Sequence, residues 1–113
     1  MTRARVTARV LASSLIRRAQ AEGGFGAVLA KGDATAGAIM VILAERGVRM
    51  ALLERLLQPD GAYAWQETGG AAADEEAFRA LLDRRRSNDP DLWLIELEVA
   101  SVERFAAEMN ATG

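Results

Sequence analysis

Apolar residues recur at helical spacing in three segments of the chain. The first predicts a helix over residues 7–21, with Thr7 as its N-cap and Gly23 as its stop. The second predicts a helix capped by Asp74, and the third predicts a helix that begins at Ser101. The buried positions expected of the three helices are Ala8, Leu11, Ala12, Leu15, Ile16 and Ala19, then Phe78, Leu81 and Leu82, then Val102, Phe105, Ala106 and Met109.

Short apolar runs bounded by turn residues predict five strands. Their ranges are 25–31, 38–45, 48–57, 62–67 and 91–99. Residues 38–45 are apolar on both sides, which indicates a central strand or one with a face closed by another subunit. Residues 48–57 fit a helix as well as a strand. The flanking turns, Arg46-Gly47 and Pro59-Asp60-Gly61, favour the strand, with residues 69–73 as a later flexible connection.

The element order is therefore α-β-β-β-β-α-β-α in one domain spanning residues 1–113. Strands joined by short turns pair antiparallel, so we expect an α+β fold with two layers. The first four strands form a meander in an antiparallel sheet of four to five strands, and about three helices cover one face. The other face keeps apolar surface, and we expect a second copy of the chain, or a cytoplasmic protein partner, to cover it. Leu52, Tyr63 and Trp65 are the interface candidates.

Composition excludes most small-enzyme chemistry. The chain has no cysteine and no histidine, which removes thiolate metal sites, thiol nucleophiles and the usual neutral-pH proton shuttle. The net charge of -2 makes nucleic acid an unlikely partner. That charge is unevenly spread, because residues 1–21 carry +5 and residues 87–113 carry -5, which favours attraction within one chain or between two copies. No apolar stretch is long enough to span a bilayer, so we expect a cytoplasmic protein. We also expect no cofactor.

Two groups of charged residues are candidate sites. Asp91, Glu96 and Glu98 offer oxygen ligands for a divalent cation, as a metal-assisted hydrolase needs. The simpler interpretation places Asp91 in a turn around Pro90 and the two glutamates on the solvent-facing side of an outer strand. Five arginines are candidates for anion binding, and the simpler interpretation is a solvated helix end favoured by the helix dipole. These arginines are Arg17, Arg18, Arg84, Arg85 and Arg86.

Several short motifs occur in an order that is similar to a known family. They are Arg17-Arg18, GGF at 23–25, KGD at 31–33, AGA at 36–38, and DPDLW at 89–93 followed by Glu96. This order resembles the alphaproteobacterial domain of unknown function family 1491, and the resemblance runs from Arg9 to Glu98. The resemblance implies no activity and supplies no catalytic or ligand-binding residue. It leaves the alternatives at residues 48–57 open.

Together these patterns favour a noncatalytic binding or self-associating module. One alternative is a small divalent-metal-assisted hydrolase that uses Asp91, Glu96 and Glu98. Another is a nucleic-acid accessory protein that uses the arginine clusters.

Overall fold

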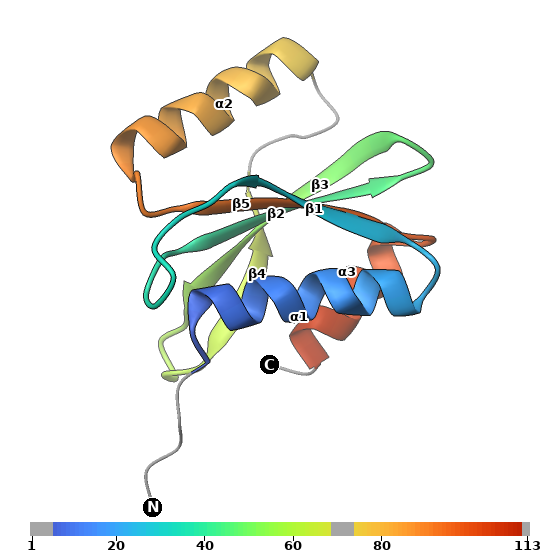
Figure 1. Cartoon of the computed structure of the whole chain (residues 1–113), viewed down its shortest axis with the longest axis horizontal. Helices are drawn as coiled ribbons and strands as arrows, with labels where there is room; N and C mark the ends of the chain where they lie inside the picture. The colour runs from blue at the N-terminus through green and yellow to red at the C-terminus, as the bar shows by residue number, and fades with distance from the viewer. Residues whose placement is uncertain (1–5, 69–73, 112–113) are drawn as a thin grey trace, which may run out of the picture.

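A computed structural model of the chain describes residues 6–68 and 74–111 (Figure 1). The predicted connection at 69–73 lies outside the described residues. The elements are α1 (Ala8–Ala21), β1 (Phe25–Ala30), β2 (Ile39–Glu45), β3 (Val48–Leu57), β4 (Tyr63–Glu67), α2 (Glu75–Asn88), β5 (Trp93–Glu98) and α3 (Val102–Ala111). The predicted α+β class and element order are confirmed, and residues 48–57 form a strand.

Local sequence signals account for the ends of these elements. The Thr7 side chain accepts a hydrogen bond from a backbone N–H of the first turn of α1, and the Asp74 side chain does the same for α2. Arg46 and Gly47 both have positive φ, at 51° and 79°, and they form the tight turn between β2 and β3. The predicted N-caps and this hairpin are confirmed.

The sheet is mixed, with strand order β1-β5-β2-β3-β4. Strands β2, β3 and β4 form a meander, as expected, but β1 does not pair with β2. Instead β5 lies between them, antiparallel to β1 and parallel to β2. The prediction of a wholly antiparallel sheet with a four-strand meander is therefore wrong. The loop after β1 is long enough to leave a gap that the last strand fills.

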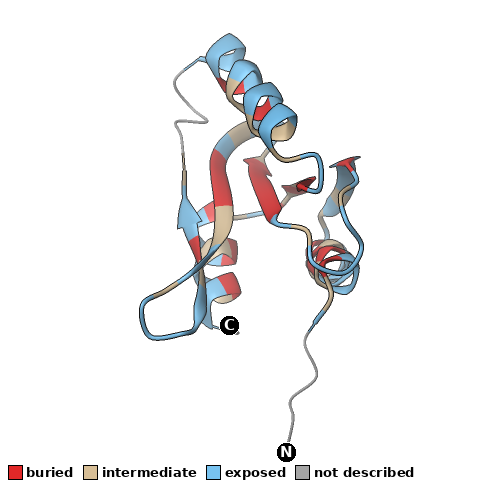
Figure 2. Cartoon of the chain, turned by 90° about the vertical axis from the view of Figure 1, so that its left-hand side faces the viewer, coloured by how far each residue is buried: buried red, intermediate tan, exposed pale blue. Residues whose placement is uncertain are grey.

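The helices cover both faces of the sheet, so the fold has three layers (Figure 1). Helices α1 and α3 pack on one face around Val41, Leu43 and Ile95. Helix α2 packs on the opposite face, where Phe78 and Leu82 join a separate cluster with strand residues. Figure 2 shows buried residues on the sides of these helices that face the sheet. The expectation of two layers with helices on one face is wrong, because α2 supplies part of the cover that we expected from a second copy.

The central position predicted for β2 is confirmed. Strand β2 is the third of five strands, and its residues from Ile39 to Ala44 are all buried. Its even-numbered residues face α2 and its odd-numbered residues face α1 and α3, so the strand contributes to both clusters. No helix within the described part of the chain is long and apolar enough to span a bilayer.

Candidate functional site

Residues of the KGD and DPDLW motifs meet at the start of β5. The backbone N–H of Asp33 donates to the carbonyl oxygen of Asp91 at 3.0 Å, and the indole N–H of Trp93 donates to the carbonyl oxygen of Asp33 at 2.6 Å. A Cβ atom at Gly32 would lie 2.0 Å from the Asp91 carbonyl oxygen, and one at Gly37 would lie 2.3 Å from it. Only glycine fits at such an approach. These motifs therefore fasten the loop between β1 and β2 to β5, which is a structural role.

A groove opens on the α2 side of the sheet, away from that loop. It lies between the N-terminal end of α2 and the β2–β3 hairpin, and its volume is about 820 Å³. Phe78 of α2 is buried at one wall, whereas Phe25 of β1 is 63% exposed and Met50 of β3 is 44% exposed. The groove is the part of this sheet face that α2 leaves open. It combines exposed apolar side chains with several charged groups and is therefore the candidate ligand site.

Charged side chains surround this apolar surface. Asp74, Glu75, Glu96 and Glu98 line the groove together with a single base, Arg49, so its lining carries a net charge of -3. Asp74 is engaged in capping α2, where its carboxylate accepts the backbone N–H of Glu76 at 3.0 Å. The groove is consequently an apolar depression with an acidic border.

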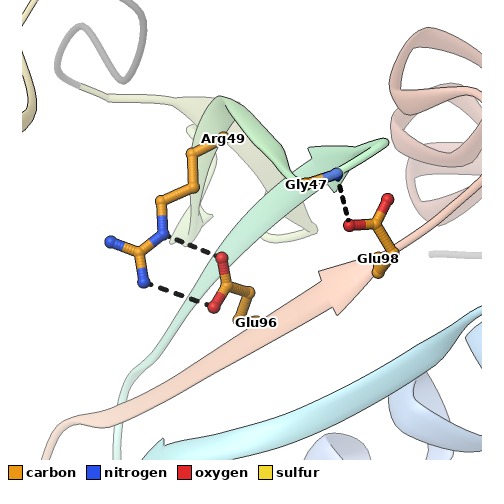
Figure 3. Close-up of polar contacts among 4 residues, drawn as sticks. All are labelled: Gly47, Arg49, Glu96 and Glu98. Atoms are coloured by element: carbon orange, nitrogen blue, oxygen red, sulfur yellow. Dashed lines mark hydrogen bonds and ion pairs between the residues drawn. The ribbon is translucent and has the colours of Figure 1, made fainter.

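Two contacts fix the glutamates of β5 (Figure 3). The Arg49 guanidinium donates to both carboxylate oxygens of Glu96, at 2.8 and 3.3 Å. This hydrogen bonding raises the pKa of Arg49, against an opposing effect of burial. Glu98 accepts the backbone N–H of Gly47 at 2.9 Å through one oxygen. Glu96 is therefore paired with a cation, whereas Glu98 keeps a carboxylate oxygen for which no partner is present among the described residues.

The predicted metal site is not formed. Asp91 precedes β5 and Glu98 ends it, and a strand rises about 3.3 Å per residue, so the two carboxyl groups lie on the order of 20 Å apart. Glu96 is already paired with Arg49. Across residues 6–68 and 74–111, no three acidic side chains come close enough together to hold a metal ion. The turn interpretation is supported, because the Asp89 side chain accepts the backbone N–H of Asp91 at 3.2 Å. The expectation that the glutamates lie on an outer strand is wrong, because β5 lies between β1 and β2.

The arginine candidates do not converge on one site. Arg17 and Arg18 belong to α1, whereas Arg84, Arg85 and Arg86 belong to α2 on the opposite face of the sheet. Arg18 lies 3.6 Å from the Glu108 carboxylate of α3, so at least one contact between the basic and acidic ends is internal. Arg85 pairs with Glu54 of β3, which raises the pKa of Arg85 through hydrogen bonding. Arg17 and Arg84 are exposed, and Arg86 is half-buried.

The interface candidates also separate. Leu52 is fully buried beneath α2, and Trp65 is buried against the α1 and α3 side of the sheet. The expectation that these two residues face a partner is wrong, since the chain's own helices cover them. Tyr63 is exposed, and the Arg55 guanidinium lies 4.2 Å from the centre of its ring.

Comparison with known proteins identifies the chain's relatives. The model of a family described as a protein of unknown function, DUF1491, matches residues 6–107. The chain belongs to the DUF1491 family. The motif-based resemblance is thereby confirmed, whereas no curated protein matches the chain.

Solved structures of DUF1491 relatives share the fold. A crystal structure of a DUF1491 family protein from Caulobacter crescentus CB15 has a TM-score of 0.78 and 30% identity, covering 89% of this chain and 94% of that one. A solution structure from A. tumefaciens has a TM-score of 0.75 and 33% identity, covering 90% of this chain and 92% of that one. Neither description states an activity or a ligand.

Sequence reasoning missed the residues that shape the groove of this DUF1491 protein. Phe25 belonged to a predicted strand with no assigned role, and Arg49 belonged to a segment that fitted either a helix or a strand. Arg49 of β3 lies on the same sheet face as Glu96 and Glu98 of β5, and this arrangement becomes visible only once β5 is placed beside β2. No short-range pattern reports such a pairing across strands.

Proposed function

We propose that this DUF1491 protein is a noncatalytic module that self-associates by pairing β1 of one copy with β1 of another. The observation that carries the proposal is the difference between the two edges of its sheet. Edge strands present unpaired backbone N–H and C=O groups, and stable monomers cover or charge them. Among residues 6–68 and 74–111, one edge is covered and carries charge, and the other has neither protection.

The β4 edge is closed by α3. The side-chain amide of Asn110 accepts the backbone N–H of Trp65 at 2.8 Å and donates to the Trp65 carbonyl oxygen at 3.1 Å. An asparagine amide thus takes the place that a neighbouring strand would occupy. The strand also carries the polar residues Gln66 and Glu67. Pairing of another chain with β4 would have to displace this clamp.

Within the described part of the chain, nothing protects the β1 edge in this way. Its sequence, FGAVLA, contains no charged residue and no proline. Among the described residues, its backbone hydrogen bonds run to β5 alone. Phe25, Val28 and Leu29 are exposed on it. A bulge lies between Val28 and Ala30, so Phe25–Val28 is the regular part of the edge. A two-fold related copy would satisfy these backbone groups and cover the apolar side chains.

Sedimentation equilibrium tests this proposal. Wild-type protein at tens of micromolar should have twice the monomer mass of 12.1 kDa. Val28→Lys should give a monomer, because an edge lysine must lose its hydration when a second strand docks. The matched control is Leu57→Lys, an exposed residue of β3 near the opposite edge, which should leave the mass unchanged. A monomeric wild type, or equal effects of the two substitutions, would refute the proposal.

The noncatalytic role rests on the chemistry that the chain offers. It has no histidine or cysteine, and among the described residues Asp91 does not join Glu96 and Glu98 in a three-carboxylate group, as the proposed metal-assisted hydrolase would need. A nucleic-acid accessory role loses support because the arginine groups occupy opposite faces of the sheet. A cytoplasmic location stays a prediction of the sequence.

A further inference from the structure

We infer that the groove between α2 and the β2–β3 hairpin binds a short basic segment of a partner protein, one that carries arginine or lysine next to apolar residues. This inference does not rest on the self-association proposed above. Its surface shares one residue, Phe25, with the β1 edge, and the other lining residues belong mainly to α2, β3 and β5.

The shape and apolar content of the groove set the size of the occupant. A volume of about 820 Å³ accommodates a few side chains and no folded domain. Phe25, Val48 and Met50 line it and are exposed, at 63%, 61% and 44%. Burying them against apolar side chains of a ligand removes this surface from water. Phe78, buried beneath α2, gives the groove a fixed wall.

The charges set the chemistry of the occupant. The lining carries a net charge of -3, so an acidic or phosphorylated ligand would be repelled and a cationic one attracted. Glu98 offers an oxygen that is not used by its bond to Gly47, and Glu75 is an exposed carboxylate of α2. A guanidinium or ammonium group reaching between them makes charge-assisted hydrogen bonds.

Arg49 provides a test of the inference, because its charge is opposite to that of the carboxylates that line the groove. Its guanidinium neutralises Glu96 through two hydrogen bonds and lies 5.7 Å from the centre of the Phe78 ring (Figure 3). Arg49 therefore pairs with Glu96 in the way that a cation of the ligand would pair with Glu98. Removing its charge makes the groove more acidic, whereas removing a carboxylate makes it less so. The two changes must therefore alter cation binding in opposite directions.

Fluorescence anisotropy at low ionic strength tests the inference with two labelled octapeptides. One alternates arginine with leucine, and the other alternates glutamate with leucine. The basic peptide should bind, and the acidic one should not. Glu98→Gln and Glu75→Gln should each weaken binding about three- to fivefold, as expected for partly exposed charge pairs. Arg49→Gln should strengthen it by a similar factor. The experiment is done on wild type and on Val28→Lys, so loss of the dimer is distinguished from loss of the groove.

The matched control has the same net charge but leaves the groove intact. Glu22→Gln and Glu103→Gln remove exposed carboxylates at the end of α1 and in α3, and neither residue lines the groove. These controls should leave affinity nearly unchanged. The inference is overturned if neither peptide binds, if both bind equally, or if the control substitutions weaken binding as much as the groove substitutions. It is also overturned if Arg49→Gln weakens binding while circular dichroism shows that the variant is folded.

Discussion

The ion pair between Arg85 and Glu54 makes a sharp prediction, because its two partners differ in their access to water. Arg85 projects from α2 and Glu54 from β3, so the pair ties the helix to the sheet. Arg85 donates to both carboxylate oxygens, one of them at 3.0 Å. The side chain of Glu54 is 12% exposed, whereas that of Arg85 is 33% exposed. Removing the arginine should therefore cost more than removing the carboxylate charge.

The magnitudes follow from what each substitution leaves behind. Arg85→Met leaves the Glu54 carboxylate without its cation and with little access to solvent. We therefore expect the free energy of unfolding to fall by about 2–3 kcal/mol. Glu54→Gln leaves a guanidinium that can turn toward water and an amide oxygen that still accepts a hydrogen bond, so the loss should be about 1 kcal/mol. In a domain of about 100 residues, 1 kcal/mol shifts Tm by about 4 °C or somewhat more. The two variants should therefore differ by several degrees.

Urea denaturation followed by tryptophan fluorescence measures both variants. Trp65 and Trp93 are buried, so their emission reports loss of the core. The control is Arg104→Met, which removes an arginine that is 79% exposed from its pair with Glu108 and should cost about 0–0.5 kcal/mol. Equal losses for the two Arg85–Glu54 variants, or a loss for Arg85→Met no greater than the control, would refute the reasoning from solvent access.

Three further predictions test other parts of the fold. Phe78→Ala should lower the free energy of unfolding by about 3 kcal/mol, because Phe78 is one of the two buried residues of α2. Hydrogen exchange should then accelerate more in α2 than in α1, and equal acceleration in both helices would contradict this. In chemical denaturation, Gly32→Ala should lower the free energy of unfolding by about 2–4 kcal/mol, since the added Cβ would meet a backbone carbonyl oxygen. Gly47→Ala should lower it by about 1 kcal/mol, because the added Cβ has open space and only the positive φ is unfavourable. Asn110→Ala should cost about 1–2 kcal/mol and yield larger species in size-exclusion chromatography as concentration rises, because the β4 edge loses its clamp; an unchanged elution profile would count against the role of the clamp.

The pairs of Arg49 and Arg85 also imply a simple dependence on pH. Both guanidinium pKa values are raised in the folded state, chiefly by hydrogen bonds to their glutamates. A raised pKa means that the contribution to stability is complete below the unfolded-state value and is lost as pH rises through the folded-state value. Neither arginine therefore makes stability vary with pH until strongly alkaline conditions.

The local elements were predictable because their signals are local. Thr7 and Asp74 cap their helices through bonds to backbone N–H groups two or three residues away. Arg46-Gly47 forms its turn because two adjacent residues adopt positive φ. The strand at 48–57 was correctly chosen from its flanking turns, although its own residues fit a helix as well as a strand. Segments whose partners lie within a few residues in sequence could be assigned without the fold.

The site was not predictable for the complementary reason. Glu96 meets Arg49 across 47 positions of sequence, and Glu98 meets Gly47 across 51. The acidic spacing on β5 suggested a metal site, because nothing in the sequence showed that a cation from the neighbouring hairpin would neutralise Glu96. The role of Asn110 could not be predicted either, since it depends on α3 lying beside the β4 edge.

The elements, their order, the buried position of β2 and the family could all be predicted from the amino-acid sequence. Helix caps, turn residues and apolar periodicity depend on residues that are close together in the chain, so short segments are enough to identify them. The position of β5 between β1 and β2, and that of α2 on the other face of the sheet, became known only from the folded chain. These choices depend on which apolar surfaces meet across the whole chain. Among the residues that the structure describes, they leave the β1 edge and an acidic groove uncovered, and local sequence patterns do not reveal either surface.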